Sequence, residues 1–286
     1  MNTISSIIPV YQDSGLPFEI LKEAVNSLLI QTHPPVEIIL SDDSSGMLVE
    51  KWVEEFNLTN SRSLIYVRNL GPSGVSSNSN FAAKLATGTF VHFLHSDDHL
   101  IGKEVYSKVI KTLESTSHQW LLLGGQMRGI VTIPNLENLN LFGVNSVGGP
   151  SGLVIKRSIF EGFDENISLL MDIEFFLRTA KNYGPPLILK DICIEYGSGD
   201  WQLTKTINEA KYCAEIDHLW KEKQLGFRDF FKLFASKDSW DIKRGAYSYV
   251  CSNSKLGRVK KFLAIVFFKY ETLKFRIASF KKGYAE

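Results

Sequence analysis

The chain has 286 residues, of which 44% are apolar and 22% are charged, a composition typical of a folded globular protein rather than a disordered one. Its formal net charge is only +1, but residues 255–282 contain nine basic side chains and one acidic one, which leaves 23 Lys and Arg against 30 Asp and Glu elsewhere. Three widely spaced cysteines form no CxxC pair, and we find neither a signal-peptide pattern nor an apolar run near the roughly 20 residues that span a bilayer.

The first 115 residues alternate between short apolar runs and helical patterns. Strands are expected at residues 6–11, 36–40, 64–67 and 89–94, and helices at about 17–29, 75–85 and 103–113. Such alternation predicts an α/β domain with a mainly parallel sheet, in which ligands bind beyond the carboxyl ends of the strands. After residue 122 the pattern loosens into loops, and the further expected elements are strands at 153–156 and 187–194, a helix at 172–181, and helices from 206 onward.

Two acidic pairs follow expected strands. Asp42 and Asp43 come after the second strand, and Asp97 and Asp98 after the fourth. Hard divalent cations such as Mg²⁺ prefer carboxylate oxygens, so the second pair is a candidate for holding a metal that stabilises a departing diphosphate. Asp42 and Asp43 are candidates for binding a nucleobase N–H or a ribose hydroxyl, and Asp172 and Glu174 for supplying a general base. The alternative interpretation of each acid is structural, as a solvated turn or a helix N-cap.

Six segments, in order, resemble the motifs of a family 2 glycosyltransferase with the GT-A fold. The resemblance covers about residues 3–205 and is carried by residues 7–11, 28–45, 74–88, 93–98, 149–152 and 171–178. It implies a GT-A, Rossmann-like mixed sheet that is mainly parallel and flanked by helices. It also implies transfer of a sugar from a nucleotide donor to an acceptor hydroxyl in a single displacement with inversion of configuration.

The resemblance further implies roles for single residues. Those expected to bind the nucleotide are Pro9, Tyr11, Asp42, Asp43, Asn80 and Asp97. Asp98, together with Asp97, is the expected ligand of Mn²⁺ or Mg²⁺. Asp172 is the expected general base, with Glu174 as its substitute. Those expected at the donor or acceptor sugar are His95, Pro150 and Ser151.

Four positions depart from the family pattern. Ser44 replaces a glycine, and Ser79 replaces an arginine, so a positive phosphate contact must come from elsewhere or be absent. His95 takes the place of an aspartate and is interpreted either as a partner of a sugar hydroxyl or as a packed core histidine. Met171 replaces a glutamate, which leaves Asp172 as the expected base. A further metal ligand stays open between His99, Asp200 and His218.

The basic segment at 255–282 has apolar residues at alternating spacings of three and four, which predicts an amphipathic helix. It is interpreted as a helix packed on the catalytic body, as an interfacial helix on an anionic inner membrane surface, or as a coiled-coil helix of a homodimer. No recognised nucleic-acid-binding motif accompanies it. We divide the chain into a GT-A domain at 1–205, with a nucleotide-binding half (1–115) and an acceptor-binding half (116–205), and a C-terminal helical region at 206–286.

The sequence therefore predicts a metal-dependent inverting glycosyltransferase. The expected donor is a UDP-linked hexose or N-acetylhexosamine, and the expected acceptor is a bacterial glycan or a lipid-linked oligosaccharide, as in lipopolysaccharide or O-antigen synthesis. The expected location is the cytoplasm, with peripheral attachment to the inner face of the membrane as one outcome. Two alternatives stay open: a catalytically inactive module that binds nucleotide or glycan, and a sugar nucleotidyltransferase. Residues 11–15 lack the basic, Gly-rich phosphate loop of the latter.

Overall fold

The computed structural model describes residues 2–139, 141, 145–206 and 209–222. By its internal contacts the chain forms two units, the first comprising Met1–Leu139 and Asn145–Thr206, the second Asn140–Val144 and Ile207–Glu286. All strands of the described residues belong to the first unit. The amphipathic helix expected at 255–282 lies outside the described residues.

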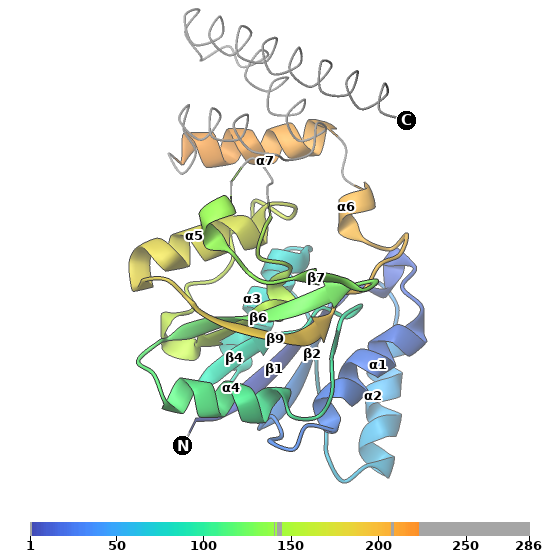
Figure 1. Ribbon diagram of the computed structural model, residues 1–286. Coiled ribbons are helices and arrows are strands. Elements are labelled where there is room, and N and C mark those ends of the chain that lie inside the picture. The colour runs from blue at the N-terminus through green and yellow to red at the C-terminus, as the bar shows by residue number, and fades with distance from the viewer. Residues whose placement is uncertain (1, 140, 142–144, 207–208, 223–286) are drawn as a thin grey trace, which may run out of the picture. The chain divides into compact units, whose positions relative to one another are not determined.

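A mixed sheet organises the first unit (Figure 1). Its strands are β1 (Ile4–Val10), β2 (Glu37–Asp42), β3 (Ile65–Arg68), β4 (Phe90–Phe93), β5 (His99–Leu100), β6 (Trp120–Met127), β7 (Ile130–Thr132), β8 (Leu153–Lys156) and β9 (Leu187–Glu195). Among the described residues they lie in the order β3-β2-β1-β4-β8-β6-β9-β5, with β7 paired to β6. The strands β1 to β4 are parallel, whereas β8 runs antiparallel to both of its neighbours, β4 and β6.

Helices cover both faces of this sheet (Figure 1). They are α1 (Phe18–Leu29), α2 (Leu48–Thr59), α3 (Val75–Leu85), α4 (Val105–Glu114), α5 (Met171–Tyr183) and α6 (Leu203–Thr206), and the second unit contains α7 (Glu209–Lys221). Tyr106 of α4 bonds to the hydroxyl of Ser6 in β1 at 2.6 Å, and Asn78 of α3 accepts the hydroxyl of Ser41 in β2 at 2.6 Å. Because Ser41 pairs with Pro9 and alternate residues of a strand face opposite sides, α3 and α4 lie on opposite faces.

Each face of the sheet has its own apolar core. On the side of α1, α2 and α4, buried residues such as Ile8 in β1 and Leu21 in α1 form one large cluster. On the other side an aromatic cluster joins the sheet to α5: the ring of Phe93 in β4 lies 5.1 Å from that of Phe163, which lies 4.7 Å from that of Phe175. Burial on both faces explains why the central strands have continuous apolar runs.

Every expected strand and helix that falls wholly on described residues is present. The helix α2 was not expected, because it buries only Val49 and Val53 and so lacks a strong apolar stripe. The strand β6 was not expected, because its apolar run gives way to Gly124 and Gly125. Both glycines lie against the backbone of β9: a Cβ at Gly124 would be 2.7 Å from the carbonyl oxygen of Asp191. None of the helices in the described ranges is long and apolar enough to cross a membrane.

Candidate functional site

The carboxyl ends of β1, β2 and β4 meet at one edge of the sheet. Asp43 follows β2 directly, and His95, Asp97 and Asp98 lie in the short loop between β4 and β5. The chain order reverses here, since β1 leads outward to β2 and β3 on one side while β4 lies on its other side. Ligands of open α/β sheets bind at such a reversal, so this edge is the candidate site.

The loop after β4 gathers a compact group of ligand atoms. His95, Asp97 and Asp98 each offer one such atom, and these atoms lie within 4.8 Å of one another. The carboxylate of Asp98 is only 6% exposed, and its Oδ1 accepts the backbone N–H of Gly197 at 2.7 Å. The indole N–H of Trp201 donates to Asp97 Oδ2 at 3.2 Å. The segment that follows β9 therefore holds both aspartates.

The electrostatics of this group suit a divalent cation. Burial raises the pKa of Asp98 to about 8, and the neighbouring carboxylate of Asp97 adds to the rise. Burial also lowers the pKa of His95, so its imidazole is neutral. The Nε2 of His95 is buried and has no hydrogen-bond partner in the part of the chain that the structure describes. A neutral imidazole with an unused nitrogen beside two crowded carboxylates fits a metal, because a cation would use that nitrogen and relieve the repulsion between the acids.

Pro150 and Ser151, which were predicted to contact a sugar, are both buried. Ser151 forms hydrogen bonds with the acidic group. Its hydroxyl donates to Asp98 Oδ2 and accepts the backbone N–H of His95 at 2.9 Å. Its carbonyl oxygen lies 2.8 Å from Nε2 of His92 in β4. This geometry gives Ser151 a positioning role and leaves no exposed surface of its side chain for a sugar.

The two aspartates after β2 have different surroundings. Asp43 is partly exposed, and its carboxylate accepts the Asn69 amide at 3.1 Å, the Ser73 hydroxyl at 2.7 Å and the backbone N–H of Gly74 at 2.8 Å. These bonds fix its direction at the start of α3. Asn69 and Ser73 were not singled out from the sequence; their position in the loop after β3, beside this edge of the sheet, was the available signal.

Asp42 is fully buried and its contacts lie within the protein. Its Oδ1 accepts the backbone N–H of Ser44 at 2.9 Å, and its Oδ2 accepts the Tyr66 hydroxyl at 3.0 Å and lies 3.4 Å from a guanidinium nitrogen of Arg68. The geometry therefore favours a supporting role for Asp42, beneath the more exposed Asp43, over direct contact with a nucleotide.

Three other predicted nucleotide contacts also differ in exposure. Asn80 is 8% exposed and fastens α3 to the segment before α5: its amide donates to the Phe163 carbonyl at 2.9 Å and to Glu165 at 3.0 Å. Pro9 is buried within β1. Tyr11, the first residue beyond β1, is 49% exposed, so it is the one of the three that is presented to a ligand.

The two acids of α5 are clearly distinguished. Asp172 lies in the first turn, is partly exposed, and accepts the Asn145 amide at 2.6 Å. A helix N-terminus stabilises the charged form of such a carboxylate. Glu174 is 1% exposed, and both of its oxygens bond to Arg178, at 2.7 and 3.0 Å. A carboxylate enclosed in an ion pair is inaccessible to a hydroxyl, so Asp172 is the better-placed base.

The further metal ligands considered from the sequence are not part of the compact acidic group found among the described residues. His99 belongs to β5, where it pairs with Glu195 of β9. Asp200 forms an ion pair with Lys205 at 2.7 Å, and its side chain is fully exposed. His218 belongs to α7, in the second unit.

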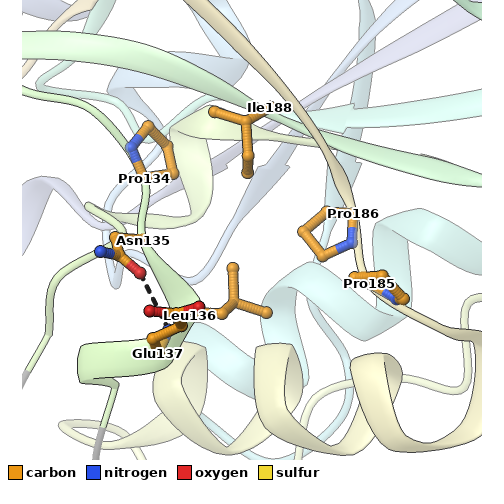
Figure 2. A pocket seen from close by; sticks show the side chains of 7 residues that line it. All are labelled: Pro134, Asn135, Leu136, Glu137, Pro185, Pro186 and Ile188. Carbon is orange, nitrogen blue, oxygen red and sulfur yellow. Dashed lines mark hydrogen bonds between the residues drawn. The ribbon is translucent and has the colours of Figure 1, made fainter.

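A surface hollow of about 310 Å³ lies elsewhere, at the amino end of β9 (Figure 2). Its lining residues are Pro134, Asn135, Leu136, Glu137, Pro185, Pro186 and Ile188. The hydrogen bond drawn in it is the local cap in which the Asn135 side chain accepts the Glu137 N–H at 3.0 Å. Three prolines and one carboxylate offer little chemistry, and the acidic group lies beyond the other end of β9, near Gly197.

Residues 5–131 match the family model "Glycosyl transferase family 2". The chain is 28% identical over 118 residues to the GalNAc(5)-diNAcBac-PP-undecaprenol beta-1,3-glucosyltransferase of Campylobacter jejuni, a match covering 41% of this chain and 37% of that protein. It is 30% identical over 109 residues to the Escherichia coli UDP-Glc:alpha-D-GlcNAc-diphosphoundecaprenol beta-1,3-glucosyltransferase WfaP, covering 38% and 41%. The chain therefore matches about two fifths of the length of each of these relatives.

Solved structures share the fold. Staphylococcus aureus TarS, residues 1–349, superposes with a TM-score of 0.58 at 18% identity over 94% of this chain and 80% of that one. A mannosyltransferase from Pyrobaculum calidifontis, solved with GDP-Man and Mn²⁺, gives a TM-score of 0.55 at 12% identity over 95% and 86%. The expected GT-A architecture is confirmed by this shared fold, and residues 5–131 match the model of glycosyl transferase family 2.

Proposed function

We propose that the protein is a metal-dependent, inverting glycosyltransferase that moves a hexosyl or N-acetylhexosaminyl group from a UDP-sugar to a hydroxyl of a bacterial glycan or lipid-linked oligosaccharide. The compact group of His95, Asp97 and Asp98 at the carboxyl edge of the sheet carries the proposal. The choice of UDP is supported by TarS, which has been solved with UDP-GlcNAc, and by the E. coli relative, whose name specifies UDP-Glc. The names of two relatives also specify undecaprenol-linked acceptors.

In this proposal the exposed side of the edge binds the nucleotide. Asp43, fixed by Asn69, Ser73 and Gly74, would accept the N3–H of the uracil ring. Tyr11 is exposed at the adjacent end of β1 and would border the base. An amide N–H donating to a carboxylate is a charge-assisted hydrogen bond, which is shorter and stronger than a neutral one.

A divalent cation would be held by the carboxylates of Asp97 and Asp98 and by Nε2 of His95. When bound, it supplies positive charge that stabilises the departing diphosphate. Carboxylates alone suit Mg²⁺, whereas an imidazole nitrogen among them favours a transition metal. We therefore propose Mn²⁺ as the preferred ion.

The transfer itself needs a base on the acceptor side. Asp172 would take the proton of the acceptor hydroxyl as that oxygen attacks the anomeric carbon of the sugar. The bond between the anomeric carbon and the diphosphate oxygen breaks on the opposite face, and UDP leaves with the electron pair. Because bond formation and bond breaking occur on opposite faces in one displacement, the anomeric configuration inverts.

The test is UDP release and sugar transfer by the full chain with UDP-glucose, UDP-galactose or UDP-GlcNAc, undecaprenyl-diphosphate-linked glycan acceptors, and Mn²⁺. Asp98→Ala should reduce transfer by at least about 100-fold, because one of the carboxylate ligands of the proposed metal is lost. Asp191→Ala is the matched control, since Asp191 is an exposed acid paired with Lys108. Sugar transfer by Asp98→Ala at the wild-type rate would refute the proposal that Asp98 binds a catalytic metal. UDP binding by calorimetry without transfer across the panel would favour the inactive binding module.

A further inference from the structure

Tyr196 has a buried hydroxyl group that no atom of the described residues satisfies. It follows β9 directly, its side chain is only 9% exposed, and its Oη has no hydrogen-bond partner among the described residues. Tyr106, by contrast, is buried with its hydroxyl 2.6 Å from Ser6 Oγ and 2.7 Å from Nδ1 of His92. Buried hydroxyls are nearly always hydrogen-bonded, because an unsatisfied one costs stability. The orphan hydroxyl of Tyr196 therefore calls for a ligand.

The protein holds this side chain in a slot lined by three glycines. A Cβ at Gly125 in β6 would lie 2.5 Å from a ring carbon of Tyr196, and one at Gly152 would lie 3.2 Å from its Oη. A Cβ at Gly148 would overlap the hydroxyl itself. Glycines from separate segments thus leave room for the ring and fix where its hydroxyl points.

The slot lies near both the proposed metal site and the proposed base. The Asn145 amide, which donates to Asp172 at 2.6 Å, also donates to the carbonyl oxygen of Gly148 at 3.1 Å. The residue after Tyr196, Gly197, donates its backbone N–H to Asp98 of the proposed metal site. Burial raises the pKa of the Tyr196 hydroxyl, and the nearby charges of Asp98 and Asp172 add to the rise, so the hydroxyl keeps its proton and serves as a donor. Two nearby carboxylates disfavour another anion at that point, so a neutral oxygen suits the hydroxyl better than a phosphate does.

We propose that the Tyr196 hydroxyl donates a hydrogen bond to an oxygen substituent of the transferred sugar, and so positions that sugar between Asp98 and Asp172. This inference rests on the proposed function, which places the sugar between the departing diphosphate and the base. Tyr196 is then a specificity-determining residue for the donor. The three glycines contribute to the same role, because they leave room for the Tyr196 ring in this position.

The test is calorimetric binding of UDP, UDP-glucose, UDP-galactose and UDP-GlcNAc to the full chain with Mn²⁺. In Tyr196→Phe the affinity for UDP should stay within about twofold of wild type, whereas the affinity for the tightest-binding UDP-sugar should fall about 5- to 20-fold. The Tm should stay the same or rise, because an unsatisfied hydroxyl is removed. Tyr106→Phe is the matched control: it removes a satisfied hydroxyl, so the Tm should fall while the ratio of UDP-sugar to UDP affinity is retained.

Two results would overturn the inference, and they differ in what else they overturn. An unchanged ratio of UDP-sugar to UDP affinity in Tyr196→Phe would refute the role of Tyr196 and leave the proposed function standing; an ordered water on the hydroxyl would give this result. A wild-type chain that binds neither UDP nor any of the three UDP-sugars would refute the proposed function and this inference together.

Discussion

At the scale of single residues, the surroundings of each acid decide whether it can meet a substrate. Asp172 accepts a neutral amide at a helix end, whereas Glu174 is enclosed with Arg178. Only an acid that can meet a substrate hydroxyl can take its proton, and an acid in a buried ion pair instead contributes to the stability of the fold. The same distinction separates Asp43 from the buried Asp42.

We expect Asp172→Asn to lower kcat by about 10²- to 10⁴-fold while the Kd for the UDP-sugar stays near that of wild type, because general-base catalysis is lost and donor binding is not. Glu174→Gln should keep kcat within about tenfold of wild type. It should lower the free energy of unfolding by about 2 kcal/mol, because Arg178 loses its buried carboxylate partner and keeps only the more exposed Glu161, 3.4 Å away. Steady-state kinetics and urea unfolding measure these effects. Lost turnover in Glu174→Gln alone would reverse the assignment of the base.

His92 gives a prediction on stability. It is fully buried, and burial lowers its pKa from the ordinary 6.5 to about 4. Between these two values the unfolded chain binds more protons than the folded one, so the free energy of unfolding falls as the pH falls from 6.5 towards 4. From pH 7 to pH 5 the contribution of His92 is about 2 kcal/mol.

Urea unfolding at the two pH values measures this contribution. The loss of stability from pH 7 to pH 5 should be smaller in His92→Gln than in wild type by about 2 kcal/mol. His118→Gln, at an exposed histidine, is the control and should lose as much stability as wild type. Equal losses in His92→Gln and wild type would show that another group sets the acid sensitivity.

At the scale of elements, the segment after β9 decides the geometry of the loop after β4. Gly197 donates to Asp98, and a Cβ at Gly197 would overlap the backbone oxygen of Asp97 and lie 2.8 Å from its Cβ. The two segments therefore fit together only if residue 197 has no side chain. At Gly46, in the loop after β2, a Cβ would meet nothing within 4 Å.

Gly197→Ala should therefore displace the Asp97–Asp98 loop and weaken binding of Mn²⁺ and of the UDP-sugar by at least about tenfold, since metal ligands tolerate little displacement. Gly46→Ala should bind both as wild type does. Calorimetry on the two variants makes the comparison. Wild-type Mn²⁺ affinity in Gly197→Ala would show that the loop does not hold the ion in this geometry.

The helices and strands also show how much of the fold and of the site the sequence could predict. The central strands and α3 were expected because each is a local pattern with clear breaks, and the acids after β2 and β4 were found because they follow such strands. The contacts from Ser151 and Gly197 to Asp98 span 53 and 99 positions along the chain. No local pattern encodes them, because they depend on the insertion of β8 beside β4 and on the register of β9.

At the scale of the whole molecule, charge is divided along the chain. The acids that form the proposed site belong to the acidic part, and the basic residues concentrate at 255–282. If this segment binds an anionic membrane surface, each Lys or Arg near that surface contributes about 1 kcal/mol, and salt weakens the interaction.

In that case the full chain should sediment with vesicles of phosphatidylglycerol and phosphatidylcholine at about 0.1 M salt, and be released at about 1 M salt, because the screening length shortens to about 3 Å. Lys260→Glu combined with Lys261→Glu should reduce the bound fraction. Lys51→Glu with Lys84→Glu, which changes as many charges in α2 and α3, is the matched control. Equal binding to pure phosphatidylcholine vesicles would exclude an electrostatic attachment.

Asp98 is held by residues that come much later in the chain, and this has a consequence for synthesis on the ribosome. A nascent chain that has emerged only to residue 131 contains the whole stretch matched by the family model, and both aspartates of the loop. It still lacks the Ser151 hydroxyl, the Gly197 N–H and the Trp201 indole that hold those aspartates. The loop can therefore adopt this arrangement only after residue 201 has left the exit tunnel, so a prematurely terminated product would carry the family's signature without a formed site.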